Sequence, residues 1–191
     1  MGATIKVDSP LAGAHQQRNI ALVIAAAAEL AERHGFPVTP AAIENGIRHT
    51  RWPGRLERIA KRNVDWILDV AHNPAGAWAL RAAVRGILEA RQRRLLVFSC
   101  LRDKPLGEMA QILFPLFDEV IVAPIHNPRA AALDDLLAAA AATGTPAHAA
   151  DSVSDALRLA QAHAAGGVAV ISGSVYLVGE ARTLLLSGTS E

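Results

Sequence analysis

The chain has 191 residues, of which 51% are hydrophobic but only 4% aromatic, and its formal net charge is +1. This length allows one sizeable domain with a buried core and a small appendage. The nearly neutral charge gives no general attraction to nucleic acid or to a membrane, so we expect neither as a partner. A single cysteine, Cys100, excludes internal disulfides and cysteine-rich metal clusters. With no long apolar span and no signal peptide, these features predict a soluble, cytoplasmic protein.

The N-terminal part of the chain is expected to form a pair of helices. A short β-like piece at residues 4–7 comes first. Apolar residues then recur at helical spacing over residues 15–33, and Gly35 is a suitable C-terminal stop. Thr39 and Pro40 begin a second, shorter helix, as an N-cap and a first helical residue. These elements bury little apolar surface by themselves.

A break in the sequence divides this helical part from the rest. Pro53 favours an extended conformation in the preceding residue, and Gly54 permits a sharp reversal. We therefore predict a linker at residues 51–55 and a second domain at residues 56–191. Residues 1–50 are too small to be a stable domain alone, so we interpret them as the end of a larger one.

Short apolar runs alternate with helical patterns throughout the second domain. Continuous apolar runs indicate strands covered on both faces, and strand–helix alternation predicts a doubly wound, mostly parallel α/β sheet. Residues 56–64 are a candidate antiparallel edge strand. The predicted strands are 66–70, 95–100, 119–123, 147–149 and 168–171, and the predicted helices are 75–90, 106–116, 129–142, 153–164 and 175–186.

The polar residues that follow these strands are candidates for a binding site. In such sheets, ligands bind beyond the carboxyl ends of the strands. Asp69 and His72 follow the first parallel strand, where Asn73 and Pro74 begin a helix whose N–H groups suit an anion. The other residues expected at this edge are the segments 100–104, 124–127 and Ser172-Gly173-Ser174.

Each candidate also has a purely structural interpretation. Asp69 is as well suited to capping its own turn as to binding a ligand. A lone histidine such as His72 is more often hydrogen-bonded within a turn than catalytic, and Ser174 is more often an N-cap. Asp103 and Lys104 are more typical of a surface turn. For Arg55, the choice is between a solvated linker arginine and one that the short loop holds beside Asp69.

The sequence lacks several signatures of catalytic and binding sites. Its seven histidines include no pair at metal-ligand spacing on one helix, so we predict no protein-built metal site. There is no Gly-x-Ser-x-Gly nucleophile elbow. There is also no Gly-x-x-x-x-Gly-Lys-Ser/Thr loop, the element that holds the β- and γ-phosphates of a nucleotide in many ATPases.

Several segments in order along the chain carry a family resemblance. They resemble the folylpolyglutamate synthase / dihydrofolate synthase family, a branch of the Mur ligases. A similar Asp-Lys loop is present at Asp103-Lys104-Pro105. The segments are His15-Gln16-Gln17-Arg18-Asn19, Trp52-Pro53-Gly54-Arg55-Leu56-Glu57, Leu68-Asp69-Val70-Ala71-His72-Asn73-Pro74 and Ser172-Gly173-Ser174-Val175-Tyr176-Leu177-Val178-Gly179-Glu180.

The resemblance implies an enzyme that uses ATP to join L-glutamate to a folate or dihydropteroate carboxylate. The carboxylate becomes an acyl phosphate, the amine of glutamate attacks it, and phosphate leaves. Such a reaction depends on positioning and on neutralising developing charge. The cofactors implied are ATP and Mg²⁺, and the partners are ATP, L-glutamate and the folate or dihydropteroate. Members of the family are usually monomers.

The resemblance also implies roles for individual residues. Asn19 matches the residue that reads the adenine of ATP, Arg55 the arginine that reaches its phosphates, and Asp69 the carboxylate that binds its ribose. His72 and Ser174 match residues near the incoming glutamate. His72 would orient either the amine or the carboxylate of that glutamate, and the sequence does not choose between them.

One departure from the family pattern limits this reading. The family has an N-terminal ATPase domain with a P-loop and the magnesium ligands, and we find neither here. Residues 1–50 resemble only its last pieces, so the chain alone is expected to have no ligase activity and at most weak ATP affinity. Two alternatives remain: a non-catalytic nucleotide-binding or interaction module, and another Mur-type amide ligase such as a cyanophycin or peptidoglycan enzyme.

Overall fold

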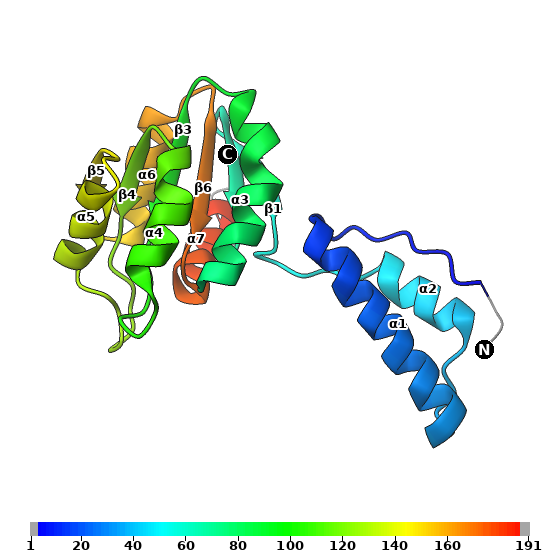
Figure 1. Ribbon diagram of the computed structural model, residues 1–191. Coiled ribbons are helices and arrows are strands. Elements are labelled where there is room, and N and C mark those ends of the chain that lie inside the picture. The colour runs from blue at the N-terminus through cyan, green and yellow to red at the C-terminus, as the bar shows by residue number, and fades with distance from the viewer. Residues whose placement is uncertain (1–3, 188–191) are drawn as a thin grey trace. The chain divides into compact units, whose positions relative to one another are not determined.

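The computed structural model describes residues 4–187, apart from the side chain of His15. Contacts between backbone positions divide the chain into two compact units, Met1–Pro53 and Gly54–Glu191. The first unit is a helix pair, and the second is a sheet with helices on both faces (Figure 1). None of the helices in the described part of the chain has the length and hydrophobicity that crossing a bilayer requires.

The first unit consists of α1 (Ala14–His34) and α2 (Pro40–Arg48). Gly35 ends α1 in the left-handed conformation, and the Thr39 hydroxyl accepts a hydrogen bond from the Ala42 N–H at the start of α2. Both helix boundaries therefore follow the local signals. The core of the unit is small, since only three hydrophobic side chains among residues 4–53 are buried: Ile20, Ile43 and Ile47.

The β-like piece expected at residues 4–7 is not a strand. In its place the backbone runs irregularly beside α2, and the Lys6 N–H donates a hydrogen bond to Glu44 Oε1 at 2.7 Å. A strand is stabilised by a neighbouring strand, and the described part of this unit offers none. Local β-propensity was therefore insufficient to form a strand here.

The second unit contains a six-stranded sheet in the order β1-β2-β6-β3-β4-β5. Only β1 is antiparallel, and the other strands are parallel to one another, which confirms the doubly wound α/β prediction. The elements are β1 (Glu57–Lys61), β2 (Val64–Leu68), α3 (Pro74–Glu89), β3 (Arg94–Phe98), α4 (Leu106–Leu113), η1 (Phe114–Leu116), β4 (Glu119–Val122), α5 (Leu133–Ala142), β5 (Ala147–Ala149), α6 (Val153–His163), β6 (Val168–Ser172) and α7 (Val175–Ser187).

Helices cover both faces of the sheet, as the continuous apolar strands required. Helices α3, α4 and α5 pack on one face, and α6 and α7 pack on the other (Figure 1). Alternate strand residues contribute to the two cores: Ile67 points to the first face, and Trp66 and Leu68 point to the second. All five residues of β6 are buried, because this strand lies in the middle of the sheet.

Several predicted boundaries differ from the structure, and three of these differences have a clear local reason. Strand β2 begins two residues early because it pairs with β1 through a turn at Arg62 and Asn63, so Asp69 lies just beyond its end. Helix α4 stops at Leu113, since Pro115 cannot continue an α-helix and a 3₁₀ turn follows. Helix α5 starts at Leu133 rather than residue 129, because residues 129–131 pair with the loop after β3.

Candidate functional site

The carboxyl ends of β2, β6 and β3 meet at one edge of the sheet. Strand β6 lies between the other two, so the chain segments after β2 and β6 are neighbours there. The Asp69 N–H donates to the Ile171 carbonyl at 3.0 Å, which joins the two segments directly. Helix α3 starts beyond β2 and helix α7 starts beyond β6, so both helix N-termini lie at this edge. This is the edge at which doubly wound sheets bind ligands.

Asp69 is held firmly in this edge by backbone hydrogen bonds. Only 5% of the residue is exposed. Its Oδ1 accepts a hydrogen bond from the Ala71 N–H, and its Oδ2 accepts one from the Leu56 N–H, both at 3.0 Å. The carboxylate therefore caps its own turn and also binds the segment that enters the sheet. A ligand would reach only the small exposed part of this residue.

The structure brings Arg55 close to Asp69, because the two backbone neighbours of Arg55, Gly54 and Leu56, are hydrogen-bonded to the end of β2. The Val70 N–H donates to the Gly54 carbonyl at 2.9 Å, and the Leu56 N–H donates to Asp69. Arg55 is half-buried in this short segment. The loop thus fixes the root of the Arg55 side chain at the end of β2.

Sequence reasoning missed the contribution of Glu57 to this arrangement. Its carboxylate accepts hydrogen bonds from the Gly54 N–H and from Arg182 Nε, both at 2.9 Å. Burial by itself raises the pKa of Glu57, but the hydrogen bonds from Arg182 and Gly54 outweigh it, so the pKa lies below its ordinary value. Arg182 lies on α7, far away in sequence, and no local pattern links it to Glu57.

His72 is exposed at the same edge and has a defined tautomer. Its Nδ1 lies 3.0 Å from the Val70 carbonyl oxygen. A carbonyl only accepts hydrogen bonds, so Nδ1 carries a proton, and in the neutral ring Nε2 presents a lone pair. Beside it, Asn73 Oδ1 accepts from the Gly76 N–H at 2.8 Å and Pro74 is the first residue of α3. The predicted helix start is confirmed.

The Ser172-Gly173-Ser174 turn packs tightly against the end of β3. Gly173 has a φ of +102°, and a Cβ atom on it would lie 2.4 Å from the Ser99 carbonyl oxygen. Ser174 is buried, and its Oγ accepts a hydrogen bond from the Tyr176 N–H at 3.2 Å. Ser174 is therefore an N-cap of α7, as its structural interpretation had it. Among the described residues, two buried hydroxyls lack a hydrogen-bond partner, Ser99 Oγ and Ser172 Oγ.

The loops after β3 and β4 are joined to each other beside this turn. Leu101 and Ala130 form an isolated antiparallel bridge, and the Arg102 guanidinium donates to the Pro128 carbonyl at 2.7 Å. Asp103 is exposed and forms an ion pair with Lys104 at 3.4 Å. The surface-turn interpretation of Asp103 and Lys104 therefore describes what this structure shows.

We expect Cys100 to be unreactive in the native protein. Burial raises the pKa of its thiol to about 11, and the charge of Asp103 contributes. At pH 8 the native chain should react with a disulfide reagent such as dithionitrobenzoate at least ~100-fold more slowly than the urea-unfolded chain, because the thiolate is the nucleophile. The folded state favours the thiol form, so its stabilising effect is present below the unfolded pKa and is lost as the pH rises toward 11.

Unfolding supplies the internal control for this measurement. Cys100 is the single cysteine, so one equivalent of reagent should be consumed per unfolded chain. Complete reaction of the native chain within seconds at pH 8 would contradict the burial of this thiol.

Asn19 belongs to the first unit and lies on the exposed side of α1. Its Nδ2 donates to Gln16 Oε1 at 3.1 Å, and Gln16 is buried. The amide oxygen and the second amide hydrogen of Asn19 therefore keep hydrogen-bonding capacity. No three His, Cys, Asp or Glu side chains within the described range are placed to hold a metal ion.

Comparison with known proteins identifies close similarity over almost the whole chain. Residues 54–175 match the family model described as Mur ligase, glutamate ligase domain. The folylpolyglutamate synthase of Lacticaseibacillus casei is 32% identical over 190 residues, which are 99% of this chain and 42% of that protein. The dihydrofolate synthase/folylpolyglutamate synthase of Mycobacterium tuberculosis is 34% identical, over 92% of this chain and 39% of that protein.

Solved structures agree with these sequence matches. The M. tuberculosis folylpolyglutamate synthase complexed with ADP has a TM-score of 0.80 and 31% identity, over 94% of this chain and 42% of that one. E. coli FolC in complex with DHPP and ADP has a TM-score of 0.78 and 29% identity, over 96% of this chain and 42% of that one. The chain thus spans about two fifths of the length of these proteins.

Proposed function

Because the chain belongs to the Mur ligase family through its glutamate ligase domain, we propose that it serves an ATP-dependent ligase that adds L-glutamate to a folate or dihydropteroate. In this reaction, ATP transfers its γ-phosphate to the acceptor carboxylate and leaves as ADP. The amine of glutamate then attacks the acyl carbon, phosphate leaves, and an amide forms. We place the protein in the cytoplasm and expect a monomer.

The observation that carries this proposal is the meeting of Asp69, His72 and Ser174 at one sheet edge. The parallel pairing of β2 with β6 brings the three residues there from segments a hundred residues apart. Two helix N-termini, those of α3 and α7, lie at the same edge and favour negatively charged groups. A glutamate has two carboxylates and ATP carries phosphates, so anion-binding groups are what such substrates need.

For the nucleotide, we propose that Asn19 binds the adenine, Arg55 a phosphate and Asp69 the ribose. An amide side chain offers a base edge both a donor and an acceptor. Residues 1–50 would then be the end of a central ATPase domain, residues 51–55 its linker, and residues 56–191 the Mur ligase C-terminal domain. Asp69 would combine ribose binding with its backbone hydrogen bonds.

For the glutamate, the hydrogen bonds within the site favour a division of roles. His72 Nδ1 is committed to the Val70 carbonyl, so the lone pair of Nε2 suits the amine of glutamate. Ser174 Oγ already accepts from the Tyr176 N–H, so its hydroxyl hydrogen suits a carboxylate of glutamate. In this proposal His72 orients the nucleophile and Ser174 orients the substrate.

Mg²⁺ and the γ-phosphate need binding groups that we do not find among the described residues. No set of His, Cys, Asp or Glu in residues 4–187 fits a metal ion, so we derive no step through Mg²⁺ on this chain. The sequence also contains no P-loop. We therefore propose that both come from a preceding ATPase domain.

The chain by itself is expected to release no phosphate when mixed with ATP, Mg²⁺, dihydropteroate and glutamate. Fusing it to the part of the L. casei enzyme that precedes the matched region should give a ligase, because that part would supply the missing groups. In this fusion, His72→Ala should raise the KM for glutamate roughly 10-fold or more and leave the KM for ATP within about twofold. Steady-state phosphate release measures the turnover of the isolated chain, the turnover of the fusion, and the KM values of the His72→Ala variant.

The complete L. casei enzyme is the assay control, and His163→Ala is the matched histidine variant, since His163 is also exposed and ends α6, outside the proposed site. Turnover by the isolated chain would contradict the dependence on another domain. Equal glutamate KM values for the fusion and its His72→Ala variant would contradict the role of His72.

A non-catalytic interaction module is the second candidate, favoured by the apolar surface of the first unit. Helix α1 exposes large hydrophobic side chains that its small core does not use, namely Leu22, Val23 and Leu30. Such a patch marks a protein interface. A folded but inactive fusion, together with an isolated chain that self-associates, would support this candidate over the ligase.

A further inference from the structure

A groove lies between the β1–β2 hairpin and helices α6 and α7, and Asp69 is not among the residues that line it. Its volume is about 410 Å³, within the range of sites that hold small molecules. No part of the proposed ligase site lines it. The lining residues are Lys61, Arg62, Trp66, Ser154, Leu157, Arg158, Gln161, Ala162, Leu184 and Leu185.

The floor of this groove is apolar and well packed. Trp66, Leu157 and Leu185 lie there, and each is at least nine-tenths buried. The Trp66 indole N–H donates to the Lys61 carbonyl at 3.3 Å, so the buried ring beneath the groove has no unpaired donor. Leu184 is partly exposed at the α7 side. Such a floor favours an apolar body over a fully polar ligand.

The rim of the groove is positively charged. Lys61 Nζ is hydrogen-bonded to the Leu185 carbonyl, and Arg158 forms an ion pair with Asp155 at 2.5 Å. Arg62 has no hydrogen-bond or ion-pair partner among the described residues. Asp155 balances only one of the three cations, so an anion is the complementary ligand.

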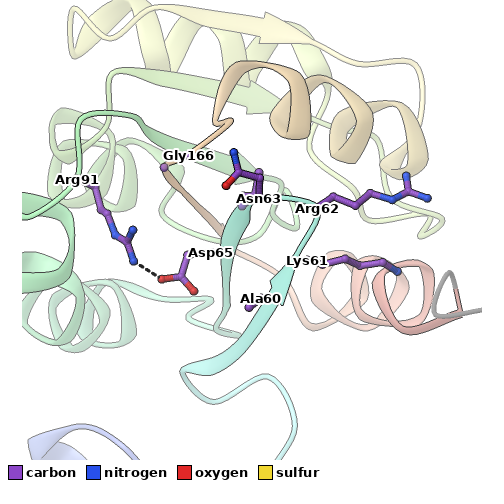
Figure 2. A pocket seen from close by; sticks show the side chains of 9 residues that line it. Ala60, Lys61, Arg62, Asn63, Asp65, Arg91 and Gly166 are labelled. Atoms are coloured by element: carbon purple, nitrogen blue, oxygen red, sulfur yellow. Dashed lines mark hydrogen bonds and ion pairs between the residues drawn. The ribbon is translucent and has the colours of Figure 1, made fainter. Parts of the chain in front are cut away.

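The other side of the hairpin is different, which makes the direction of Arg62 informative. There a second pocket of about 450 Å³ contains Asp65, which pairs with both Arg58 and Arg91 at 2.6 Å. Figure 2 shows that the side chains of Arg62 and Lys61 extend away from Asp65 and Arg91, toward α7. Arg62 and Lys61 line both pockets, and their side chains extend toward the α6–α7 one (Figure 2).

The hairpin turn fixes the origin of the Arg62 side chain. Arg62 and Asn63 have φ values of +51° and +59°, a left-handed pair that suits Asn or Gly better than Arg. The adjoining strands pair over their full length, so the turn has little freedom to move. The sequence thus keeps an arginine where the backbone favours a smaller residue, at the rim of an apolar groove.

We propose that this groove binds a small amphiphilic anion: one carboxylate, sulfonate or phosphate at Arg62, joined to an apolar body of one or two rings on the floor. The excess of positive charge selects the anion, and the limited volume selects a small molecule rather than an extended peptide. This site is separate from the proposed ligase site and does not depend on that function.

Anilinonaphthalene sulfonate, which has this chemistry, is the probe. The purified chain should bind one equivalent, with saturable fluorescence and energy transfer from Trp66. Arg62→Asn should weaken binding at least about 10-fold, because it removes a charge-assisted hydrogen bond. Asn suits the left-handed conformation, so this variant should fold at least as well as the original chain. Amide chemical-shift changes should appear around Lys61, Ser154 and Leu184.

Arg85→Asn is the matched control, because Arg85 is an exposed arginine on α3, on the opposite face of the sheet. The affinity of this variant for the sulfonate should stay within about twofold of that of the original chain. Uncharged phenylnaphthylamine should bind more weakly than the sulfonate and should not respond to Arg62→Asn. Equal sulfonate affinity for the Arg62→Asn variant would overturn the proposal. Amide chemical-shift changes confined to the exposed face of α1 would also overturn it. So would a chain that binds vesicles of anionic lipid but does not bind the sulfonate.

Discussion

Gly173→Ala is expected to lower the free energy of unfolding of the Gly54–Glu191 unit by about 2–5 kcal/mol. Two effects combine in this change. A residue with a Cβ pays to adopt the φ of +102°, and the new methyl group would lie 2.4 Å from the Ser99 carbonyl oxygen and 2.6 Å from the Phe98 ring. The neighbours are backbone and a buried ring, so neither can move aside without disturbing β3. Urea denaturation followed by circular dichroism measures the loss.

Gly86→Ala is the matched control for this substitution. Gly86 lies within α3, and a Cβ atom on it would meet nothing within 4 Å. Alanine is the better helix former, so this variant should gain up to about 1 kcal/mol. A loss of less than about 1 kcal/mol in Gly173→Ala would show that the ends of β3 and β6 adjust easily, and the tight packing described here would be wrong.

Asp69→Ala is expected to cost roughly 2–5 kcal/mol of stability with no nucleotide present. The buried carboxylate satisfies the N–H groups of Leu56 and Ala71, and alanine would leave both without a partner. Asp69→Asn should lose less, because its amide oxygen still accepts one of the two hydrogen bonds. Urea titrations of the three proteins give this ranking directly.

The ribose-binding role of Asp69 needs a separate measurement. Calorimetric titration of ATP into the folded Asp69→Asn fusion should show affinity about tenfold weaker than the unchanged fusion. Asp135→Ala removes an exposed carboxylate at the start of α5 and should cost at most about 1 kcal/mol without affecting ATP. Equal ATP affinity with and without Asp69 would leave this residue a purely structural one.

Most of the fold could be predicted because its local signals agree with one another. Asn73 with Pro74 starts a helix, Ser152 caps the next-to-last one, and Gly144 ends another in the left-handed conformation. The order of the strands could not be predicted, since nothing in residues 168–172 says that they pair between β2 and β3. Residues 4–7 show the opposite error, a strand pattern without a partner strand.

The site was predictable to the level of the sheet edge and no further. Parallel topology alone places Asp69 and Ser174 at the same edge. The side chains of Asp69 and Ser174 accept hydrogen bonds from the N–H groups of Leu56, Ala71 and Tyr176. These bonds depend on how tightly the turns after β2 and β6 close. The Glu57–Arg182 pair joins positions 125 apart in sequence, which local pattern reading cannot detect.

The position of β6 also constrains the order in which this protein matures during synthesis. Strands β2 and β3 do not pair with each other, and each is joined to the sheet through β6. Until the ribosome has made residues 168–172, the hairpin and the three-stranded remainder are two open-edged halves. The emerging polypeptide therefore carries unpaired apolar strand edges while residues 69–167 are made, which is the state that chaperones protect from aggregation.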